Sequence, residues 1–246
     1  MIHRSAVRLL SAAGAATTAV ALLSACSMLG PDKHREVSYE VGAPVHKLVI
    51  KGGTGDIRVV GGGSAVNVTE KQNYKSSAPH TTHTTADGTL TLTYDCHDCG
   101  VDYDVRVPTG TTVSVTTDTG DVSLTGVSGS ATARTDTGDV SLTAMGGPVT
   151  AGSNTGDVSG IRLKAARARL STQTGGVRAT FSNAPSAVHA TSQTGGVRIA
   201  VPPGAPYAVR AEAQTGKVDV RIEQDDNSPH TITAKTQTGD VTVERT

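Results

Sequence analysis

The octapeptide DTGDVSLT occupies residues 118–125 and recurs unchanged at residues 136–143. Its central motif, Thr-Gly followed by one variable residue and then Val or Ile, occurs eight times in the chain. The motif glycines are Gly55, Gly120, Gly138, Gly156, Gly175, Gly195, Gly216 and Gly239. From Gly120 onward they are separated by 18, 18, 19, 20, 21 and 23 residues. A near-constant period of this size is typical of a solenoid, in which each repeat forms one coil that packs on the next.

The residues that flank each turn predict short β-strands. Apolar side chains alternate after the turn, as in Val122 and Leu124, and a second alternating pair follows, as in Ala131 and Ala133. A period of two sends one set of side chains inward and the other outward. We therefore predict an all-β fold over residues 44–246, a single-stranded β-helix (β-solenoid) of short coils with two or three strands each. A barrel or sandwich would instead show turn signals every 8–12 residues.

Stacking of the coils at about 4.8 Å should align equivalent residues into columns. One column holds the motif threonines, from Thr54 to Thr238. Just before it lies a polar column whose amides can hydrogen-bond along the stack. Its members are Asp118, Asp136, Asn154, Gln173, Gln193, Gln214 and Gln237. The 65 residues between Gly55 and Gly120 leave room for about three further coils with disguised turns, and residues 70–100 form an insert that breaks the rhythm.

The composition agrees with a core of small side chains. The chain has one Phe, five Tyr and no Trp, but 28 Gly. Large aromatic groups usually dominate a globular core of this size, so stacked Val, Ile, Leu and Ala must replace them here. The 22 basic residues balance the 22 acidic ones, which gives no indication of a nucleic-acid partner.

The first 25 residues have the layout of a secretory signal: a short basic start, then an apolar run. The run ends in Leu23-Ser24-Ala25-Cys26, which resembles the bacterial lipobox. We expect Cys26 to be diacylated and to become the mature N-terminus, since two acyl chains make a stable membrane anchor. Residues 26–43 are polar and lack a sustained period, which predicts a tether. The chain should therefore be lipid-anchored on the extracytoplasmic face of the cell membrane.

Cys96 and Cys99 enclose a His-Asp pair between two predicted strands. A structural disulfide across a tight turn is the interpretation we favour, because disulfides form outside the cytoplasm. A zinc site would need two further ligands, for which His80 and His83 are nearest. A redox motif would need the first cysteine at a helix N-terminus, and no helical pattern is present.

A second candidate site is the acidic column of the turns. Asp121, Asp139 and Asp157 should stack, flanked by Asp118 and Asp136. Like charges at this spacing either turn into water or hold a cation, so calcium is an alternative to a solvated acidic edge. Later coils replace these acids with Gly176, Gly196 and Lys217, which argues against a continuous file of cations.

Two arginines, Arg178 and Arg198, occupy equivalent repeat positions and predict a solvated or sugar-facing stripe. No Ser/His/Asp set and no phosphate-binding glycine loop occurs in a suitable context. We therefore expect no catalytic residues and no cofactor.

The chain resembles the β-strand-repeat, adhesin-like domain of unknown function called the toastrack domain. The resemblance covers residues 44–246 and includes the Thr-Gly-Asp-Val turns. Further matching segments are Val45–Gly52, Thr54–Ile57, Val105–Gly110, Tyr207–Val209 and Thr238–Val243. It implies a single-stranded β-helix exposed on the cell envelope, often near envelope-stress signalling systems, with no agreed activity.

We therefore expect a non-enzymatic envelope lipoprotein, either an adhesin-like surface-binding module or a scaffold. Its partners would be the membrane, through the lipid on Cys26, and a cell-wall polymer or an envelope protein. One alternative is an accessory or sensor element of an envelope-stress circuit. Another is a β-helix carbohydrate-active enzyme, which would need converging acids in a groove.

Overall fold

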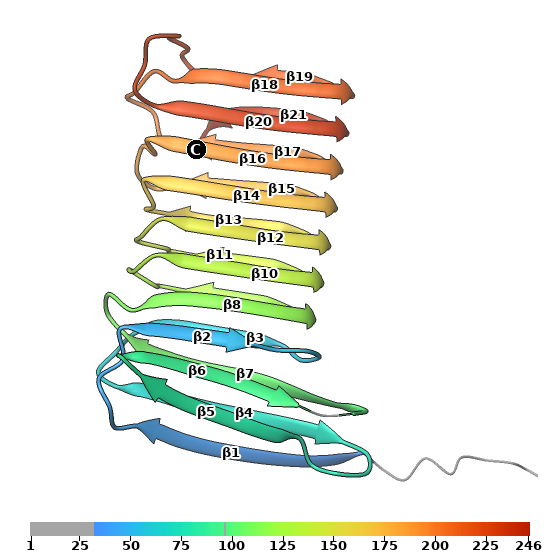
Figure 1. The fold of residues 1–246 in the computed structure, drawn as a ribbon. Helices are drawn as coiled ribbons and strands as arrows, with labels where there is room; N and C mark the ends of the chain where they lie inside the picture. The colour runs from blue at the N-terminus through green and yellow to red at the C-terminus, as the bar shows by residue number, and fades with distance from the viewer. Residues whose placement is uncertain (1–31, 96) are drawn as a thin grey trace, which may run out of the picture. The chain divides into compact units, whose positions relative to one another are not determined.

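The computed structural model describes residues 32–95 and 97–246 (Figure 1). The predicted signal segment, Cys26 and Cys96 lie outside the described residues. Within the described ranges the chain folds into strands and turns without helices, and the strands form two sheets. The predicted all-β solenoid is confirmed.

Sheet A has 11 strands and sheet B has 10. The spatial order of sheet A is β1 (Lys33–Val41), β4 (Val66–Tyr74), β7 (Cys99–Pro108), β3 (Ile57–Gly63), β9 (Val122–Thr125), β11 (Val140–Thr143), β13 (Val158–Leu163), β15 (Val177–Phe181), β17 (Val197–Val201), β21 (Val241–Arg245) and β19 (Val218–Val220). The spatial order of sheet B is β18 (Ala208–Thr215), β20 (Thr231–Thr238), β16 (Ala187–Thr194), β14 (Arg167–Thr174), β12 (Val149–Thr155), β10 (Ala131–Thr137), β8 (Thr112–Thr119), β2 (Lys47–Lys51), β6 (Thr89–Asp95) and β5 (His80–Ala86).

Each coil contributes one strand to each sheet, so a coil has two strands rather than three. Neighbouring coils pair in parallel and in the register of the sequence repeat, with Val122 opposite Val140 and Val140 opposite Val158. The inward side chains of both sheets form one core. Leu124 and Leu142 are typical members, each at most 1% exposed. Stacking therefore buries the inner face that one coil could not bury alone.

The Thr-Gly corner joins the two sheets, and its glycine has two reasons to be there. Gly138 has a φ of +139°, which other residues rarely adopt. A Cβ added at Gly138 would also overlap the backbone oxygen of Gly120 in the neighbouring coil. The other corner glycines face the same kind of backbone contact. Close stacking of the coils thus explains why glycine holds through all eight turns.

The N-terminal end of the stack differs from the prediction of three disguised coils. Strand β3 pairs directly with β9, and the chain between them crosses to the other side of the β2–β3 coil. There β6 and β7 make one further parallel coil, while β1, β4 and β5 pair antiparallel as a cap. The described residues of the predicted insert at 70–100 thus lie in β4, β5, β6 and β7 and in the turns between these strands. The antiparallel strands need no Thr-Gly corner, and the parallel β6–β7 coil turns between Asp95 and Cys99 without the motif.

The predicted tether is also shorter than expected. Residues 33–41 form β1, which pairs with β4 along its whole length, from Lys33 opposite Tyr74 to Val41 opposite Val66. The inward positions Val37, Tyr39 and Val41 are partly buried against the end of the core. The prediction of a tether at 26–43 was therefore wrong for 33–41, because these side chains cover an otherwise open end of the stack.

The C-terminal end departs from chain order as well. Strand β21 lies between β17 and β19, and β20 lies between β16 and β18 (Figure 1). The last coil of the chain is therefore inserted beneath the one before it. The first coil, β2–β3, is inserted in the same way between β6–β7 and β8–β9. Both terminal coils thus have neighbours on two sides.

Two polar side chains of β4 are buried within the N-terminal cap. Tyr39 donates a hydrogen bond to a carboxylate oxygen of Glu70 at 2.8 Å, and the Gln72 amide donates to its other oxygen at 3.2 Å. Glu70 and Gln72 are each only 2% exposed. The Tyr39 ring stacks on His83 of β5, with ring centroids 4.6 Å apart. These contacts join the end strands of the two sheets.

Candidate binding surfaces

The outer face of sheet B carries a polar groove of about 590 Å³ that crosses β10, β12, β14, β16, β20 and β18. Its walls are hydroxyl, amide and charged side chains in repeat register. Hydroxyls of the inner row are used by the fold: Thr135 donates to Gly120 O at 3.0 Å, and Ser153 donates to Gly138 O at 2.8 Å. The outer row consists of the amide column, which is exposed to solvent.

The predicted amide ladder forms over only part of its column, from Asp136 to Gln173. Asn154 donates to Asp136 at 2.8 Å, and Gln173 donates to Asn154 at 3.0 Å. In the described residues the side chains of Gln193, Gln214 and Gln237 make no hydrogen bond. Longer side chains can turn outward, so their amides remain available to a ligand along the groove.

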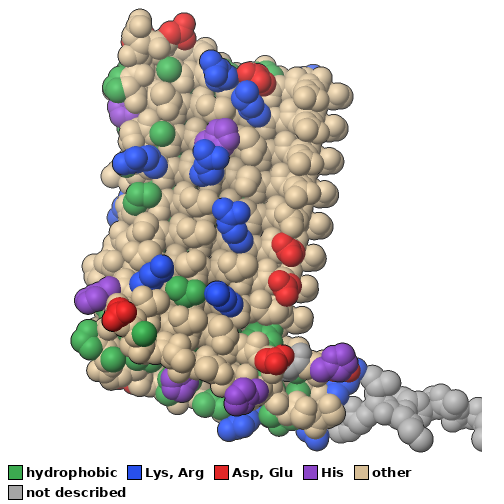
Figure 2. Space-filling model, viewed as in Figure 1, with side chains coloured by type: hydrophobic (Ala, Val, Ile, Leu, Met, Phe, Trp, Pro, Cys, Tyr) green, Lys and Arg blue, Asp and Glu red, His purple; other side chains and the backbone are tan. Residues whose placement is uncertain are grey.

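Arg134 lines this groove, and further basic side chains lie on the same face of sheet B, with Arg169 and His189 lining a second groove. Lys51 lies two strands from Arg134 in the same cross-strand row, with Thr116 between them, while Arg169 lies next to His189 in another row. Figure 2 shows Lys and Arg side chains spread over the face, with acidic side chains fewer and mostly near its edge. Lys235 is paired with Glu212 at 2.8 Å. Burial, Arg169 and Lys235 lower the pKa of His189 below its usual value. The face therefore favours anionic ligands.

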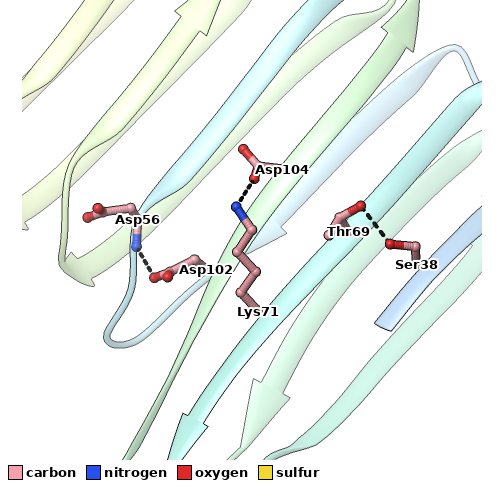
Figure 3. Close-up of polar contacts among 6 residues, drawn as sticks. All are labelled: Ser38, Asp56, Thr69, Lys71, Asp102 and Asp104. Atoms are coloured by element: carbon pink, nitrogen blue, oxygen red, sulfur yellow. Dashed lines mark hydrogen bonds and ion pairs between the residues drawn. The ribbon is translucent and has the colours of Figure 1, made fainter. Parts of the chain in front are cut away.

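The acidic column of the turns lies where each coil enters sheet A, and it has a structural role there. The backbone N–H of Asp139 donates to the Asp121 carboxylate at 2.8 Å, and the N–H of Asp157 donates to Asp139 at 2.7 Å. Figure 3 shows the first step, in which the Asp56 N–H donates to Asp102 at 2.9 Å. Each carboxylate thus accepts the N–H of the next coil. We call this series of contacts the carboxylate ladder.

The calcium alternative for Asp118, Asp121, Asp136, Asp139 and Asp157 stays a prediction. Asp118 and Asp136 lie exposed at the ends of β8 and β10, while the other three belong to the carboxylate ladder. Across the described ranges, no three or more His, Cys, Asp or Glu side chains gather as a metal site would require.

The cysteine motif is partly visible. Cys99, the first residue of β7, is disulfide-bonded. Cys96 lies outside the described residues, so its pairing with Cys99 stays a prediction. His80 and His83 both lie on β5 in sheet B, whereas Cys99 lies in sheet A.

The two predicted stripe arginines do lie side by side. Arg178 of β15 is directly opposite Arg198 of β17 on the outer face of sheet A. Arg198 is paired with Glu244 at 2.5 Å, while Arg178 has no ion pair with any described residue. A groove of about 460 Å³ lies beside them.

One feature of these surfaces is not evident from the sequence repeat. The basic residues of sheet B sit at different offsets from the motif threonine, Arg134 three residues before Thr137 and Arg169 five residues before Thr174. Aligning the repeats and comparing only the outward positions would have placed both on one face. The described part of the chain contains no helix that could span a membrane.

Comparisons with known proteins give a family and a set of structural likenesses. The sequence profile of the Toastrack DUF4097 family matches residues 45–244. A candidate cell adhesion protein from Clostridium sporogenes is 13% identical, over 87% of this chain and 100% of the other, with a TM-score of 0.36. A candidate adhesin from Bacteroides fragilis is 14% identical, over 87% and 97% of the two chains, with a TM-score of 0.47. No curated protein is significantly similar in sequence.

Proposed function

The chain belongs to the Toastrack DUF4097 family, whose activity is unknown, and we propose that it is a non-enzymatic binding module of the cell envelope. Its ligand is an extended, hydroxyl-rich anionic polymer of the envelope. The polymer lies across the coils on the outer face of sheet B. The observation that carries this proposal is the polar groove with its flanking basic residues.

The groove suits a polymer because its chemistry repeats from coil to coil. It crosses six strands, which at about 4.8 Å per strand makes a surface roughly 24 Å long. Free amides of Gln193, Gln214 and Gln237 can donate to and accept from sugar hydroxyls. The large hydrophobic side chains exposed among the described residues, Ile161 and Val218, both lie in sheet A. A dry protein interface would need apolar anchors at this place on sheet B.

Charge decides between neutral and anionic polymers. Arg134 and Arg169 project from the outer face of sheet B without an ion-pair partner in the described chain. Exposed cations of this kind raise the local concentration of anions and lose that effect as salt is added. An anionic polymer can contact several of them at once, which multiplies weak contacts into useful affinity.

The membrane anchor is part of the same proposal. The lipobox at residues 23–26 supports lipidation of Cys26 and display of the solenoid on the extracytoplasmic face of the membrane. Metabolic labelling with a palmitate analogue tests this step. Label on the parent chain and none on a Cys26→Ser variant is expected; equal label on both would refute the anchor.

The binding proposal is tested by sedimentation of the purified full-length chain with isolated anionic envelope polymer. A double variant, Arg134→Gln with Arg169→Gln, should lose at least about tenfold in affinity, since two charge-assisted contacts disappear. The control, Arg58→Gln with Arg106→Gln, removes the same charge from sheet A and should bind as the parent does. Equal losses in both pairs would overturn the assignment to sheet B.

The same samples test the absence of catalysis. Polymer recovered after long incubation with the chain should keep its length distribution. Shortened polymer would show that the groove cleaves its ligand and would contradict the proposal.

A further inference from the structure

The carboxylate ladder on the edge of sheet A has six steps in the described chain, each 2.7–2.9 Å long. In each step an Asp carboxylate accepts the backbone N–H at the equivalent position of the neighbouring coil. The donors are Asp56, Asp121, Asp139, Asp157, Gly176 and Lys217. The fold therefore presents a backbone donor suited to a carboxylate at every such corner.

The ladder is interrupted at two adjacent coils. Gly176 and Gly196 stand where other coils carry Asp, so they offer no carboxylate to the next coil. As a result, the backbone N–H groups of Gly196 and Asp240 have no hydrogen-bond acceptor among the described residues. Both residues are exposed. A backbone donor that is held in place without a partner is ready to bind an anion.

A groove of about 460 Å³ opens at this interruption, and charged and hydroxyl side chains line it. Arg178 lies two residues after Gly176 and therefore projects from the same face of the strand. Its guanidinium has no ion-pair partner among the described residues, whereas Arg198 next to it is held by Glu244. An unpaired guanidinium and two unpaired N–H groups that line the same groove are all donors that a carboxylate can accept.

The rest of the lining narrows the class of ligand. Asp157 and Asp240 flank the interruption, and each uses only one carboxylate oxygen for the ladder. A ligand whose carboxylate is surrounded by hydroxyls could donate to the remaining oxygens, whereas a simple anion would be repelled. Hydroxyls of Ser141, Ser159 and Thr242 complete the walls. Val158, Val177 and Val197, which also line the groove, are buried in the core, so the exposed lining is mainly polar.

We propose that this groove, defined by Gly176, Gly196, Asp240 and Arg178, binds the carboxylate of a uronic acid residue in an acidic glycan. The carboxylate takes the position of the missing Asp side chain, accepts the free N–H groups and pairs with Arg178. The sugar hydroxyls donate to Asp157 and Asp240. The site lies on sheet A, opposite the polymer-binding face of sheet B, and does not depend on the proposal made for that face.

Two substitutions test the site by calorimetry with a trigalacturonate oligosaccharide and the purified full-length chain. Gly176→Asp restores the missing carboxylate within the chain; its Cβ would lie 3.5 Å from Gly196 O, an ordinary contact. It should abolish binding at this site, measured in the Arg134→Gln, Arg169→Gln background that weakens the sheet B face, and leave the melting temperature equal to or above that of the parent. Gly176→Ala adds the Cβ alone and should keep the affinity within about threefold.

Arg178→Gln should weaken trigalacturonate at least about tenfold, while Arg58→Gln, the same charge change elsewhere on sheet A, should leave it unchanged. Neutral trigalactose, acetate and an Asp-rich peptide should bind far more weakly. Absence of trigalacturonate binding, or unaltered binding by Gly176→Asp, would overturn the site. Acetate or peptide binding as tightly as trigalacturonate would overturn the assignment to a glycan. Arg134→Gln with Arg169→Gln should not affect this site, which separates its failure from failure of the sheet B proposal.

Discussion

The middle coils, from β8 to β17, and the coils at the two ends share one repeat but are stabilised in different ways. In the middle, chain order and spatial order agree, and every coil is covered on both sides by an almost identical one. At the N-terminal end, the later strands β6 and β7 cover the first coil, β2–β3. At the C-terminal end, the earlier strands β18 and β19 cover the last coil, β20–β21. The middle therefore depends on close backbone stacking, whereas the ends depend on which side chains close the stack.

The difference shows how a solenoid can secure its termini. Chain ends fray unless they are tied down, and an open edge strand invites pairing with another chain. Insertion gives β20 and β21 neighbours on both sides although they are the last strands of the chain. At the other end, antiparallel β1, β4 and β5 replace the repeat with a cap.

The largest expected loss of stability comes from a substitution in the middle coils. Gly138→Ala places a Cβ against the backbone of Gly120 at a φ of +139°, so neither coil can relax without separating from the other. We expect a loss of more than about 4 kcal/mol in the free energy of unfolding, or no folded protein. Urea denaturation measures it. Gly126→Ala is the control, because Gly126 has a φ of +66° with open space around it and should cost only about 1–2 kcal/mol.

Core truncation should also separate middle from end. Leu142 is 1% exposed between two stacked coils, and Leu142→Ala should cost about 2–5 kcal/mol. Ile222 follows β19 in the outermost coil and is only partly buried. Ile222→Ala should cost less than about 1.5 kcal/mol, since much of its side chain already contacts water. Equal costs by urea denaturation would contradict the distinction.

The hydrogen bond between Tyr39 and Glu70 should contribute to the stability of the N-terminal end. Tyr39→Phe removes the hydroxyl that donates to buried Glu70, and it should cost about 1.5–3 kcal/mol because the carboxylate loses a partner. Tyr74→Phe is the matched control, since the Tyr74 hydroxyl makes no hydrogen bond in the described structure. Thermal melting of both variants compares them; similar midpoints would show that the cap does not rely on this contact.

Alkaline pH should loosen the ends while sparing the middle. Burial raises the pKa of Tyr39, Tyr94, Tyr103 and Tyr207 above the usual value of about 10, and none of the five tyrosines lies in the middle coils. A folded pKa above the unfolded one stabilises the protein below the unfolded pKa, and this contribution is lost as pH rises through the folded pKa. Tyrosinate absorbance from these four residues should therefore appear above pH 10, together with partial loss of circular dichroism. Ionisation of these four tyrosines near pH 10 without structural change would contradict this prediction.

Local patterns predict the middle of the molecule and fail where two arrangements share one pattern. Thr-Gly corners and alternating Val and Leu determine a coil by themselves, because each acts through its nearest neighbours. Thr215 and Thr238 carry the same motif, and either could stack on Thr194; only the fit of whole coils places Thr238 there. A signal did exist for β1, since Val37, Tyr39 and Val41 alternate as a strand does.

The candidate sites also divide into features that the repeat pattern predicts and features that only the stacked coils reveal. The adjacency of Arg178 and Arg198 could be predicted because they share one offset in the repeat. The free N–H groups of Gly196 and Asp240 could not, because the role of the turn carboxylates as backbone acceptors emerges only when the coils are stacked. Asp looked like a possible ligand for a cation, whereas its absence creates the candidate anion site.

Amide hydrogen exchange followed by mass spectrometry tests the inserted coils most directly. Our account predicts that segment 231–245, at the very end of the chain, exchanges more slowly than segment 208–222, which forms the outermost coil. Fastest exchange in segment 231–245, with segment 208–222 protected, would show that the coils stack in chain order and would contradict it.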